Sequence, residues 1–189
     1  MLSGNKVRRY DRNSGALLAT VAEGAAGGIV GGTFVALIPN PALDETPTVQ
    51  LGGHTSGNWY NPDTSGIGFQ IEATTAIDAA SGLPVMLVYW FAYAPDGNTQ
   101  SWIYGQGTYN PTSNTVTLPA AITSGARFPP NFNHDDINAV AWGTLTFTFS
   151  DCNNGTASWN STVPGYGSGS MAITRLTQIA GTTCPGAAP

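Results

Sequence analysis

The sequence predicts an all-β fold in which about eight short antiparallel strands form an up-and-down barrel. Three observations carry this prediction. Alternating apolar and polar residues recur at hairpin spacing after residue 57, turn-forming residues separate these runs, and no ten-residue window has a convincing helical period. A β-sandwich would share these features, and the barrel is favoured by the residues on the first and last strands described below.

The composition limits the size and the partners of the protein. Its 189 residues suit one domain, or one domain with an added segment. Only 9% of the residues are charged, against about 25% in a typical soluble domain. Residues 1–50 are electrically balanced, whereas residues 51–189 hold two arginines and seven carboxylates, so 2 − 7 = −5. An acidic body of this kind argues against nucleic acid and membrane partners, since both anionic surfaces attract basic proteins.

The first fifty residues predict a separate N-terminal β segment. Residues 5–21 have the pattern of a hairpin, with the turn-rich stretch 11–15 between two short strands. The apolar stretch Thr33–Ile38 predicts a further strand that must dock on another surface. Prolines and glycines then mark a connector, so we expect an N-terminal region at 1–50 and a barrel domain at 51–189.

The barrel strands follow in order along residues 51–189. We expect them near residues 57–61, 67–74, 84–94, 99–108, 114–119, 140–150, 156–162 and 168–177. Leu145, Phe147 and Phe149 alternate with threonines, which is typical of a wall with one buried face. The strand Val85–Phe91 is apolar on both faces, so it needs a cover outside the barrel, either the Thr33–Ile38 segment or another subunit.

The two cysteines indicate a disulfide and an oxidising compartment. The predicted strand 140–150 ends at Cys152, the next strand runs away, and the last strand returns to the same end of the barrel. The tail then needs only to fold over that end for Cys184 to reach Cys152, although two free buried thiols are the alternative. A disulfide favours an extracellular or cell-surface protein. No recognisable signal peptide begins the chain, so a leader has been replaced or the chain is a piece of a longer one.

Trp59 and Arg175 indicate how the barrel closes. Gly57-Asn58-Trp59 opens the first strand, and Arg175 on the last strand shares a face with apolar residues. This pair resembles the calycin barrels, the lipocalins and avidins, in which a first-strand Trp packs under a last-strand cation. A cation–π contact would explain an inward-facing arginine. The alternative is a surface arginine beyond a bulge.

The avidin resemblance extends over residues 57–108 and implies a ligand site. Trp59-Tyr60-Asn61 with Ser65 has the spacing of the avidin W-Y-N-x-x-x-S start, and Trp90 and Trp102 match two pocket tryptophans on adjacent strands. The resemblance departs at Pro62, in the first turn, at Gln100, which replaces a hydroxyl residue, and in a later pocket carboxylate that we do not find. It implies the ligand-binding residues Asn61, Ser65, Trp90, Gln100 and Trp102.

A second resemblance covers residues 57–184. The patterns W-Y-N-P-x-x-S-G-x-G-F, W-F-x-Y-x-x-D-G, D-C-N-N-G-T and G-Y-G-S-G-S are similar to a domain of secreted or surface proteins of proteobacteria. That family has no activity known to us. The resemblance therefore implies a fold and a location, and no function.

Metal and catalytic chemistry are not indicated. His134-Asp135-Asp136 are consecutive, and consecutive residues seldom converge on one ion. There is no G-x-S-x-G nucleophile motif, and the carboxylates lie mostly at turns or strand ends. We expect no catalytic residues, no metal and no cofactor.

The aromatic residues leave two functional hypotheses. Most of them are expected in the core, whereas a minority could line a cup or form a flat sugar-binding face. The leading hypothesis is a non-catalytic extracellular binding module for a small molecule or glycan. The alternative is a self-assembling surface or filament subunit, a homo-oligomer or polymer in which the N-terminal segment complements a neighbour.

Overall fold

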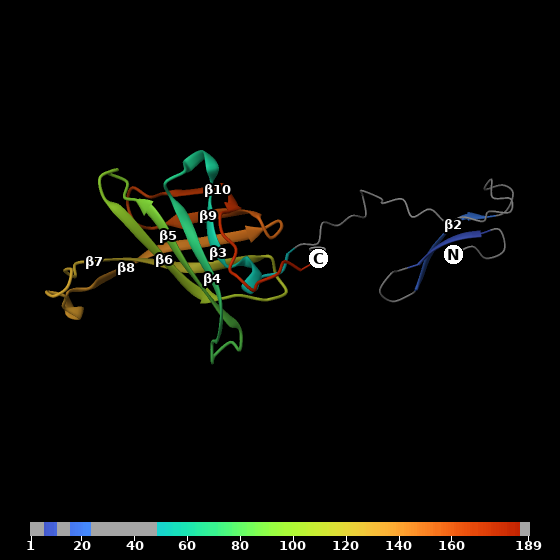
Figure 1. The fold of residues 1–189 in the computed structure, drawn as a ribbon, viewed down its shortest axis with the longest axis horizontal. Helices are drawn as coiled ribbons and strands as arrows, with labels where there is room; N and C mark the ends of the chain where they lie inside the picture. Colours follow the sequence, from blue (N-terminus) through green and yellow to red (C-terminus); the bar gives the residue numbers. More distant parts are fainter. Residues whose placement is uncertain (1–5, 11–15, 24–48, 186–189) are drawn as a thin grey trace. The chain divides into compact units, whose positions relative to one another are not determined.

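The chain divides into two compact units, Met1–Asp44 and Glu45–Pro189. The computed structural model describes residues 6–10, 16–23 and 49–185 (Figure 1). The predicted boundary at residue 50 lies near this division, and Val49 and Leu51 are both buried in the barrel core. Each unit is described by itself.

The N-terminal unit contains the predicted hairpin. β1 (Lys6–Tyr10) pairs antiparallel with β2 (Leu17–Glu23), and the register shifts twice along the pair. The predicted docking strand Thr33–Ile38 lies outside the described residues, so its role stays a prediction.

The second unit is a closed barrel of eight antiparallel strands, as the sequence predicts (Figure 1). Each strand pairs with its sequence neighbours, and β10 pairs with β3 to close the wall. No α-helix occurs in residues 49–185, only the short 3-10 turns η2 (Gly53–Thr55), η3 (Pro62–Thr64) and η4 (His134–Asp136). The strands are β3 (Gly57–Tyr60), β4 (Gly68–Ile77), β5 (Pro84–Tyr93), β6 (Gln100–Thr108), β7 (Thr115–Ser124), β8 (Asn138–Phe149), β9 (Asn154–Ser161) and β10 (Ser168–Arg175).

The main difference from the predicted strands is the length of β7. Its predicted end at Pro119 is wrong, because the strand continues to Ser124. Proline lacks the backbone N–H that a ladder needs and is tolerated at strand irregularities. Here Pro119 pairs with Thr144, and the register against β8 shifts directly afterwards, between Ala120 and Ala121. The irregularity lets the strand continue past the proline.

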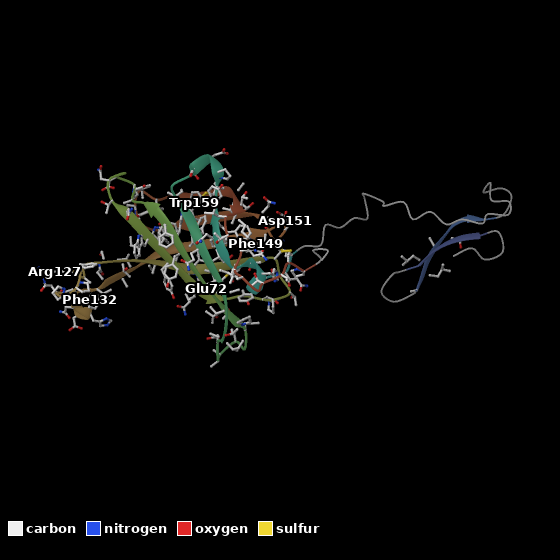
Figure 2. The ribbon with its side chains drawn as sticks, viewed as in Figure 1. Glu72, Arg127, Phe132, Phe149, Asp151 and Trp159 are labelled. Carbon is white, nitrogen blue, oxygen red and sulfur yellow. A yellow bond between two sulfur atoms is a disulfide. The ribbon has the colours of Figure 1, made fainter. Side chains whose placement is uncertain are left out.

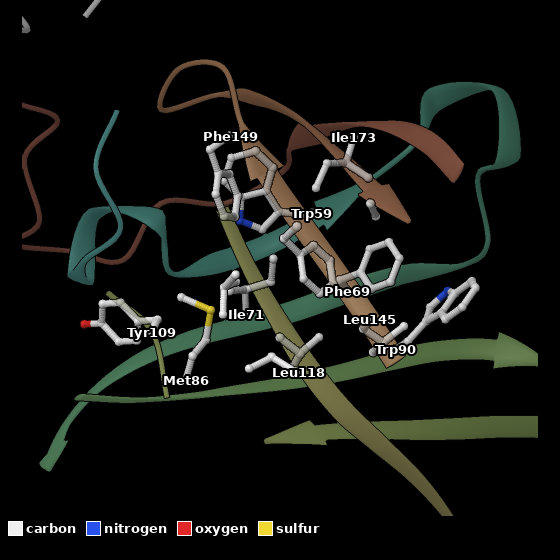
Figure 3. Packing of buried hydrophobic residues seen from close by; sticks show 14 of the residues in the cluster. Trp59, Phe69, Ile71, Met86, Trp90, Tyr109, Leu118, Leu145, Phe149 and Ile173 are labelled. Atoms are coloured by element: carbon white, nitrogen blue, oxygen red, sulfur yellow. The ribbon is translucent and has the colours of Figure 1, made fainter. Parts of the chain in front are cut away.

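Alternate residues of every strand fill the barrel with side chains. The ring of Phe69 packs 5.1 Å from Trp90 and 5.1 Å from Phe147, and Trp59 packs 4.9 Å from Phe149 (Figure 3). Aliphatic residues complete the core, among them Ile71, Met86, Val88, Ile103, Leu118, Leu145 and Ile173. The interior is thus packed along the length of the strands.

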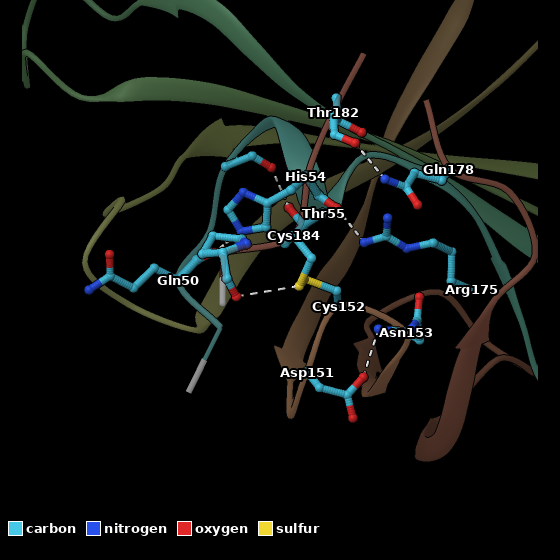
Figure 4. Close-up of a disulfide and its surroundings, with 12 residues drawn as sticks. Gln50, His54, Thr55, Asp151, Cys152, Asn153, Arg175, Gln178, Thr182 and Cys184 are labelled. Carbon is cyan, nitrogen blue, oxygen red and sulfur yellow. Dashed lines mark hydrogen bonds between the residues drawn. A yellow bond between two sulfur atoms is a disulfide. The ribbon is translucent and has the colours of Figure 1, made fainter. Parts of the chain in front are cut away.

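One end of the barrel, which we call the floor, is closed by Arg175 and Trp59. The Arg175 guanidinium carbon lies 5.0 Å from the Trp59 ring centroid, so the predicted cation–π contact is confirmed. Arg175 Nη2 donates a hydrogen bond to the His54 carbonyl (Figure 4). Trp59 Nε1 donates to the Thr55 carbonyl at 3.0 Å. Burial lowers the pKa of Arg175, and the charge of Asp151 opposes that shift. The first and last strands are therefore joined through side chains as well as backbone.

The floor is also tied by the predicted disulfide, which the structure confirms. Cys152 and Cys184 are 32 residues apart, with their Cα atoms 6.0 Å from each other (Figure 4). Cys152 is buried in the core, and the tail after β10 crosses the floor to reach it. Asn58 holds the same tail, because its backbone N–H and its side-chain amide both donate to Thr177 Oγ1.

Candidate functional site

The end opposite the floor, which we call the mouth, collects the residues that the sequence singled out. Four hairpin loops lie at that end, at residues 61–67, 94–99, 125–137 and 162–167. The five predicted ligand residues lie in these loops or on the adjoining halves of β5 and β6. They do not form one pocket, because they are divided between the inside and the outside of the wall.

Trp90 and Trp102 face opposite sides of the barrel. Trp90 lies inside with 6% of its surface exposed, whereas Trp102 lies outside and is 64% exposed. The register explains the separation, since Trp102 pairs with Phe91 rather than with Trp90. In a pleated strand, a shift of one residue moves a side chain to the other face. The pair of pocket tryptophans implied by the avidin resemblance is therefore not brought together.

The first mouth loop separates Asn61 from Ser65. Asn61 is half-buried, and its side-chain oxygen accepts a hydrogen bond from the Asp63 backbone N–H at 2.8 Å, so it caps η3. Ser65 is exposed and lines a groove on the outer wall together with Phe91. Asn61 thus shapes the loop, while Ser65 is available to a ligand outside the barrel.

Five aromatic side chains cover the outer surface of β5 and β6, and we call them the outer aromatic face: Tyr89, Phe91, Tyr93, Trp102 and Tyr104. Phe91 and Tyr93 are 40% and 54% exposed. Trp102 packs edge-on against Phe91 with 5.8 Å between ring centroids, and Tyr89 lies 5.3 Å from Tyr104. These contacts place the rings side by side on one surface of the barrel wall.

Exposed glutamine amides border the aromatic rings. Gln70 pairs with Tyr89, and Gln100 pairs with Tyr93. Gln106 is exposed on the same face of β6, where its side-chain oxygen accepts a hydrogen bond from the Tyr104 hydroxyl. Burial raises the pKa of Tyr104, so this phenol stays neutral at physiological pH. The predicted residues Gln100 and Trp102 therefore belong to one surface that mixes aromatic rings with amides.

A groove of about 460 Å³ adjoins Phe91 at the β3–β4 side of this face. Tyr60, Ile67 and Leu176 supply its apolar walls, with Ser65 at its edge. Gly68, beside the groove, lets β3 and β4 approach closely, because a β-carbon there would lie 2.8 Å from the Trp59 carbonyl oxygen. A ligand that binds the outer aromatic face could therefore extend into this groove.

The wall around this face carries almost no charge. Strands β5 to β9 contain no Asp, Glu, Lys or Arg, and Glu72 on β4 is the nearest charged strand residue. The other described charges of the barrel unit lie in loops or at the floor. Such a surface favours an uncharged ligand, since it offers no ion pair to compensate the desolvation of a charged one.

A second apolar surface lies beside the β7–β8 hairpin. A groove of about 340 Å³ is lined by Tyr104, Pro119, Ala121 and Val140 among others. The hairpin loop itself exposes Phe128 (91%) and Phe132, and Figure 2 shows Arg127 and Phe132 at its projecting end. These side chains are exposed rather than packed into the barrel.

The structure assigns His134-Asp135-Asp136 to the turn η4. The side-chain oxygen of Asn133 caps the turn by accepting a hydrogen bond from the Asp135 backbone N–H at 3.1 Å. In the described part of the chain, no three His, Cys, Asp or Glu side chains are grouped as metal ligands would be. Within the same residues, no helix has the length and apolarity needed to span a membrane.

The sequence reasoning missed Phe91 as a candidate. The signal was present, because the strand Val85–Phe91 is apolar on both faces and one face had to lie outside the barrel. What the sequence did not supply was the register that places Phe91 beside Trp102.

Comparison with known proteins adds no relative: no family model matches the chain, and neither a curated protein nor a solved structure is significantly similar to it.

Proposed function

We propose that the barrel is a non-catalytic extracellular binding module whose outer aromatic face holds an uncharged glycan. The observation that carries the proposal is the pair Phe91 and Trp102, whose rings pack together and are exposed on two adjacent strands that contain no charged side chain. Large exposed apolar surfaces on soluble domains generally mark interaction sites.

The chemistry of this face suits a sugar chain. A pyranose ring has an apolar C–H face, which stacks on aromatic rings, and a rim of hydroxyl groups, which needs hydrogen-bonding partners. Trp102, Phe91 and Tyr93 offer ring surface, and the amides of Gln70 and Gln100 can both donate and accept hydrogen bonds. The overall charge of −5 disfavours an acidic polysaccharide.

The disulfide supports a location outside the cell. A bond between Cys152 and Cys184 persists in oxidising compartments such as the periplasm or the cell exterior.

The absence of a catalytic role is supported by the carboxylates of the barrel unit. Asp78, for example, accepts hydrogen bonds from the backbone N–H and the hydroxyl of Ser81 within its own turn, which lowers its pKa.

A binding titration tests the proposal. Cellohexaose, chitohexaose and mannohexaose would each be titrated into the wild-type protein and into Trp102→Ala. We expect at least one of the three to bind, and we expect Trp102→Ala to weaken that binding at least tenfold. Phe132→Ala is the matched control, because it also removes an exposed aromatic ring, but from the β7–β8 hairpin. Failure of all three sugars to bind, or equal losses in the two variants, contradicts the proposal.

The alternative is self-assembly into a surface polymer, and the exposed β7–β8 hairpin favours it. Phe128, Phe132 and Ile137 all expose apolar surface there, which a second copy of the chain could cover. Native mass spectrometry separates the two functions. Multiples of 19.5 kDa that disappear in Phe128→Ser with Phe132→Ser, or on deletion of residues 1–44, would support assembly; a monomer that binds sugar would support the module.

A further inference from the structure

A hydrogen bond crosses the mouth of the barrel. Tyr166, in the β9–β10 loop, shares it with Ser101 on β6, and their hydroxyl oxygens are 2.8 Å apart. In the closed strand order, β6 lies on the opposite side of the barrel from β9 and β10. The bond therefore spans the opening, and we call it the latch.

The β9–β10 loop contacts a second loop and contains two glycines with positive φ angles. A β-carbon at Gly165 would lie 3.0 Å from the ring of Pro95 in the β5–β6 loop, so the two loops touch. Gly165 and Gly167 have φ angles of 91° and 63°, which glycine adopts without strain. The latch therefore adds to the other contacts of Tyr166, which include the edge-on packing of its ring against Trp142 and a hydrogen bond from its backbone N–H to the Val163 carbonyl.

Three tryptophans lie beneath the latch. The ring of Tyr166 is 5.5 Å from that of Trp142, and Trp90 is 6.0 Å from Trp142 and 5.1 Å from Trp159. These side chains come from β5, β8 and β9, so they line the interior from several sides. No charged side chain is part of this cluster.

Two of the three indoles have unused hydrogen-bond donors. Trp90 Nε1 and Trp142 Nε1 are buried and have no acceptor among the described residues. Trp59 Nε1 at the floor, in contrast, donates to the Thr55 carbonyl at 3.0 Å. Buried tryptophan N–H groups normally have a partner, so two unpaired donors under one latch point to an acceptor that enters from outside.

We propose that the mouth is a second, internal binding site for a small, uncharged, planar molecule that carries a hydrogen-bond acceptor oxygen. Entry breaks the Tyr166–Ser101 bond and swings Tyr166 outward. The ligand ring then packs against Trp142 and Trp90, and its oxygen accepts a hydrogen bond from their N–H groups. This site is inside the wall, so the proposal does not depend on glycan binding to the outer aromatic face.

A pair of probe molecules tests the role of the acceptor. Coumarin is planar, uncharged and bears a carbonyl oxygen, whereas naphthalene has a similar bicyclic shape and no acceptor. Both would be titrated into the ¹⁵N-labelled protein while the five indole N–H signals are followed. We expect coumarin to shift the signals of Trp90 and Trp142 downfield, and naphthalene to produce no downfield shift of either.

Variants then test the donors and the latch. Trp142→Phe keeps a ring and removes the N–H, so we expect it to weaken coumarin binding about tenfold. Tyr166→Phe removes the hydroxyl of the latch and keeps the ring that packs against Trp142, so we expect it to strengthen coumarin binding severalfold. Tyr109→Phe is the matched control, because Tyr109 is a buried tyrosine near the floor, and it should bind coumarin as the wild type does.

The proposal is overturned if coumarin leaves the Trp90 and Trp142 signals unchanged in both the wild type and Tyr166→Phe. It is also overturned if coumarin shifts only the Trp102 signal, since binding is then confined to the outer wall. Because Tyr166→Phe alters one partly buried loop residue, this arm remains decisive even if Trp142→Phe fails to fold.

Discussion

Replacing Arg175 by methionine should destabilise the barrel at its floor. Methionine keeps a long apolar side chain but removes the guanidinium, which lies 5.0 Å from the Trp59 ring centroid and donates to the His54 carbonyl. A cation–π contact contributes about 0.5–2 kcal/mol, and a hydrogen bond from a charged group about 1.5–3 kcal/mol. Because Arg175 is only partly buried, solvent screens both contacts, and we expect a net loss of about 2 kcal/mol.

Urea unfolding followed by tryptophan fluorescence measures this loss. The urea concentration at the midpoint of unfolding should fall in Arg175→Met. The dependence of the free energy of unfolding on urea concentration should stay constant, since the surface exposed on unfolding hardly changes. The stability of Arg175→Lys should lie between those of the wild type and Arg175→Met, because lysine keeps the charge but lacks the planar guanidinium group. Arg127→Met, on the exposed β7–β8 hairpin, is the control and should stay within about 0.5 kcal/mol of the wild type. The reasoning is refuted if Arg175→Met is as stable as that control.

Three further changes test other parts of the structure. Cys152→Ser with Cys184→Ser opens a loop of 32 residues, and chain entropy predicts a loss of about 3.7 kcal/mol in urea unfolding; no loss would mean that the tail is held by other contacts. Gly68→Ala places a β-carbon 2.8 Å from the Trp59 carbonyl, so thermal unfolding should show a loss of about 1–3 kcal/mol, and an unchanged Tm would contradict the close approach. Burial alone would raise the pKa of Asp151, but hydrogen bonds from Asn153 and Asn154 outweigh it and the pKa is lowered. The stability that Asp151 contributes is thus present above about pH 4 and lost as the pH falls through its folded pKa. The free energy of unfolding of Asp151→Asn should therefore be lower than that of the wild type by under about 1 kcal/mol at pH 7, and it should decrease less on acidification. Identical dependences of the free energy of unfolding on pH in the two proteins would contradict this.

The strands could be predicted because each one is determined by residues that are close together in the sequence. Leu145, Phe147 and Phe149 alternate with threonines, and each strand ends at residues that form turns, so all eight strands were found. The floor could be predicted as well, because the inward parity of Arg175 demanded a partner. β7 was cut short because Pro119 is normally a strand breaker, and the compensating shift of register appears only in three dimensions.

The site could be predicted only in part, because its faces depend on register. Trp90 and Trp102 both looked like pocket residues, yet the pairing of Phe91 with Trp102 puts one inside and the other outside. The strand Val85–Phe91 is apolar on both faces, which indicates that one face lies outside the barrel, but its sequence does not show which face that is. The latch between Ser101 and Tyr166 joins residues 65 positions apart and depends on the path of a loop, which no local pattern specifies.

The central claim is that the outer aromatic face binds the ligand. The most direct test follows the indole N–H signals of the five tryptophans while the neutral oligosaccharides are added. Trp102 is 64% exposed, whereas Trp59 and Trp142 are fully buried. Our account predicts that the Trp102 signal moves and saturates while those of Trp59 and Trp142 stay in place. A sugar that moves the buried indoles and leaves Trp102 unchanged, or no response from any of the five, would contradict it.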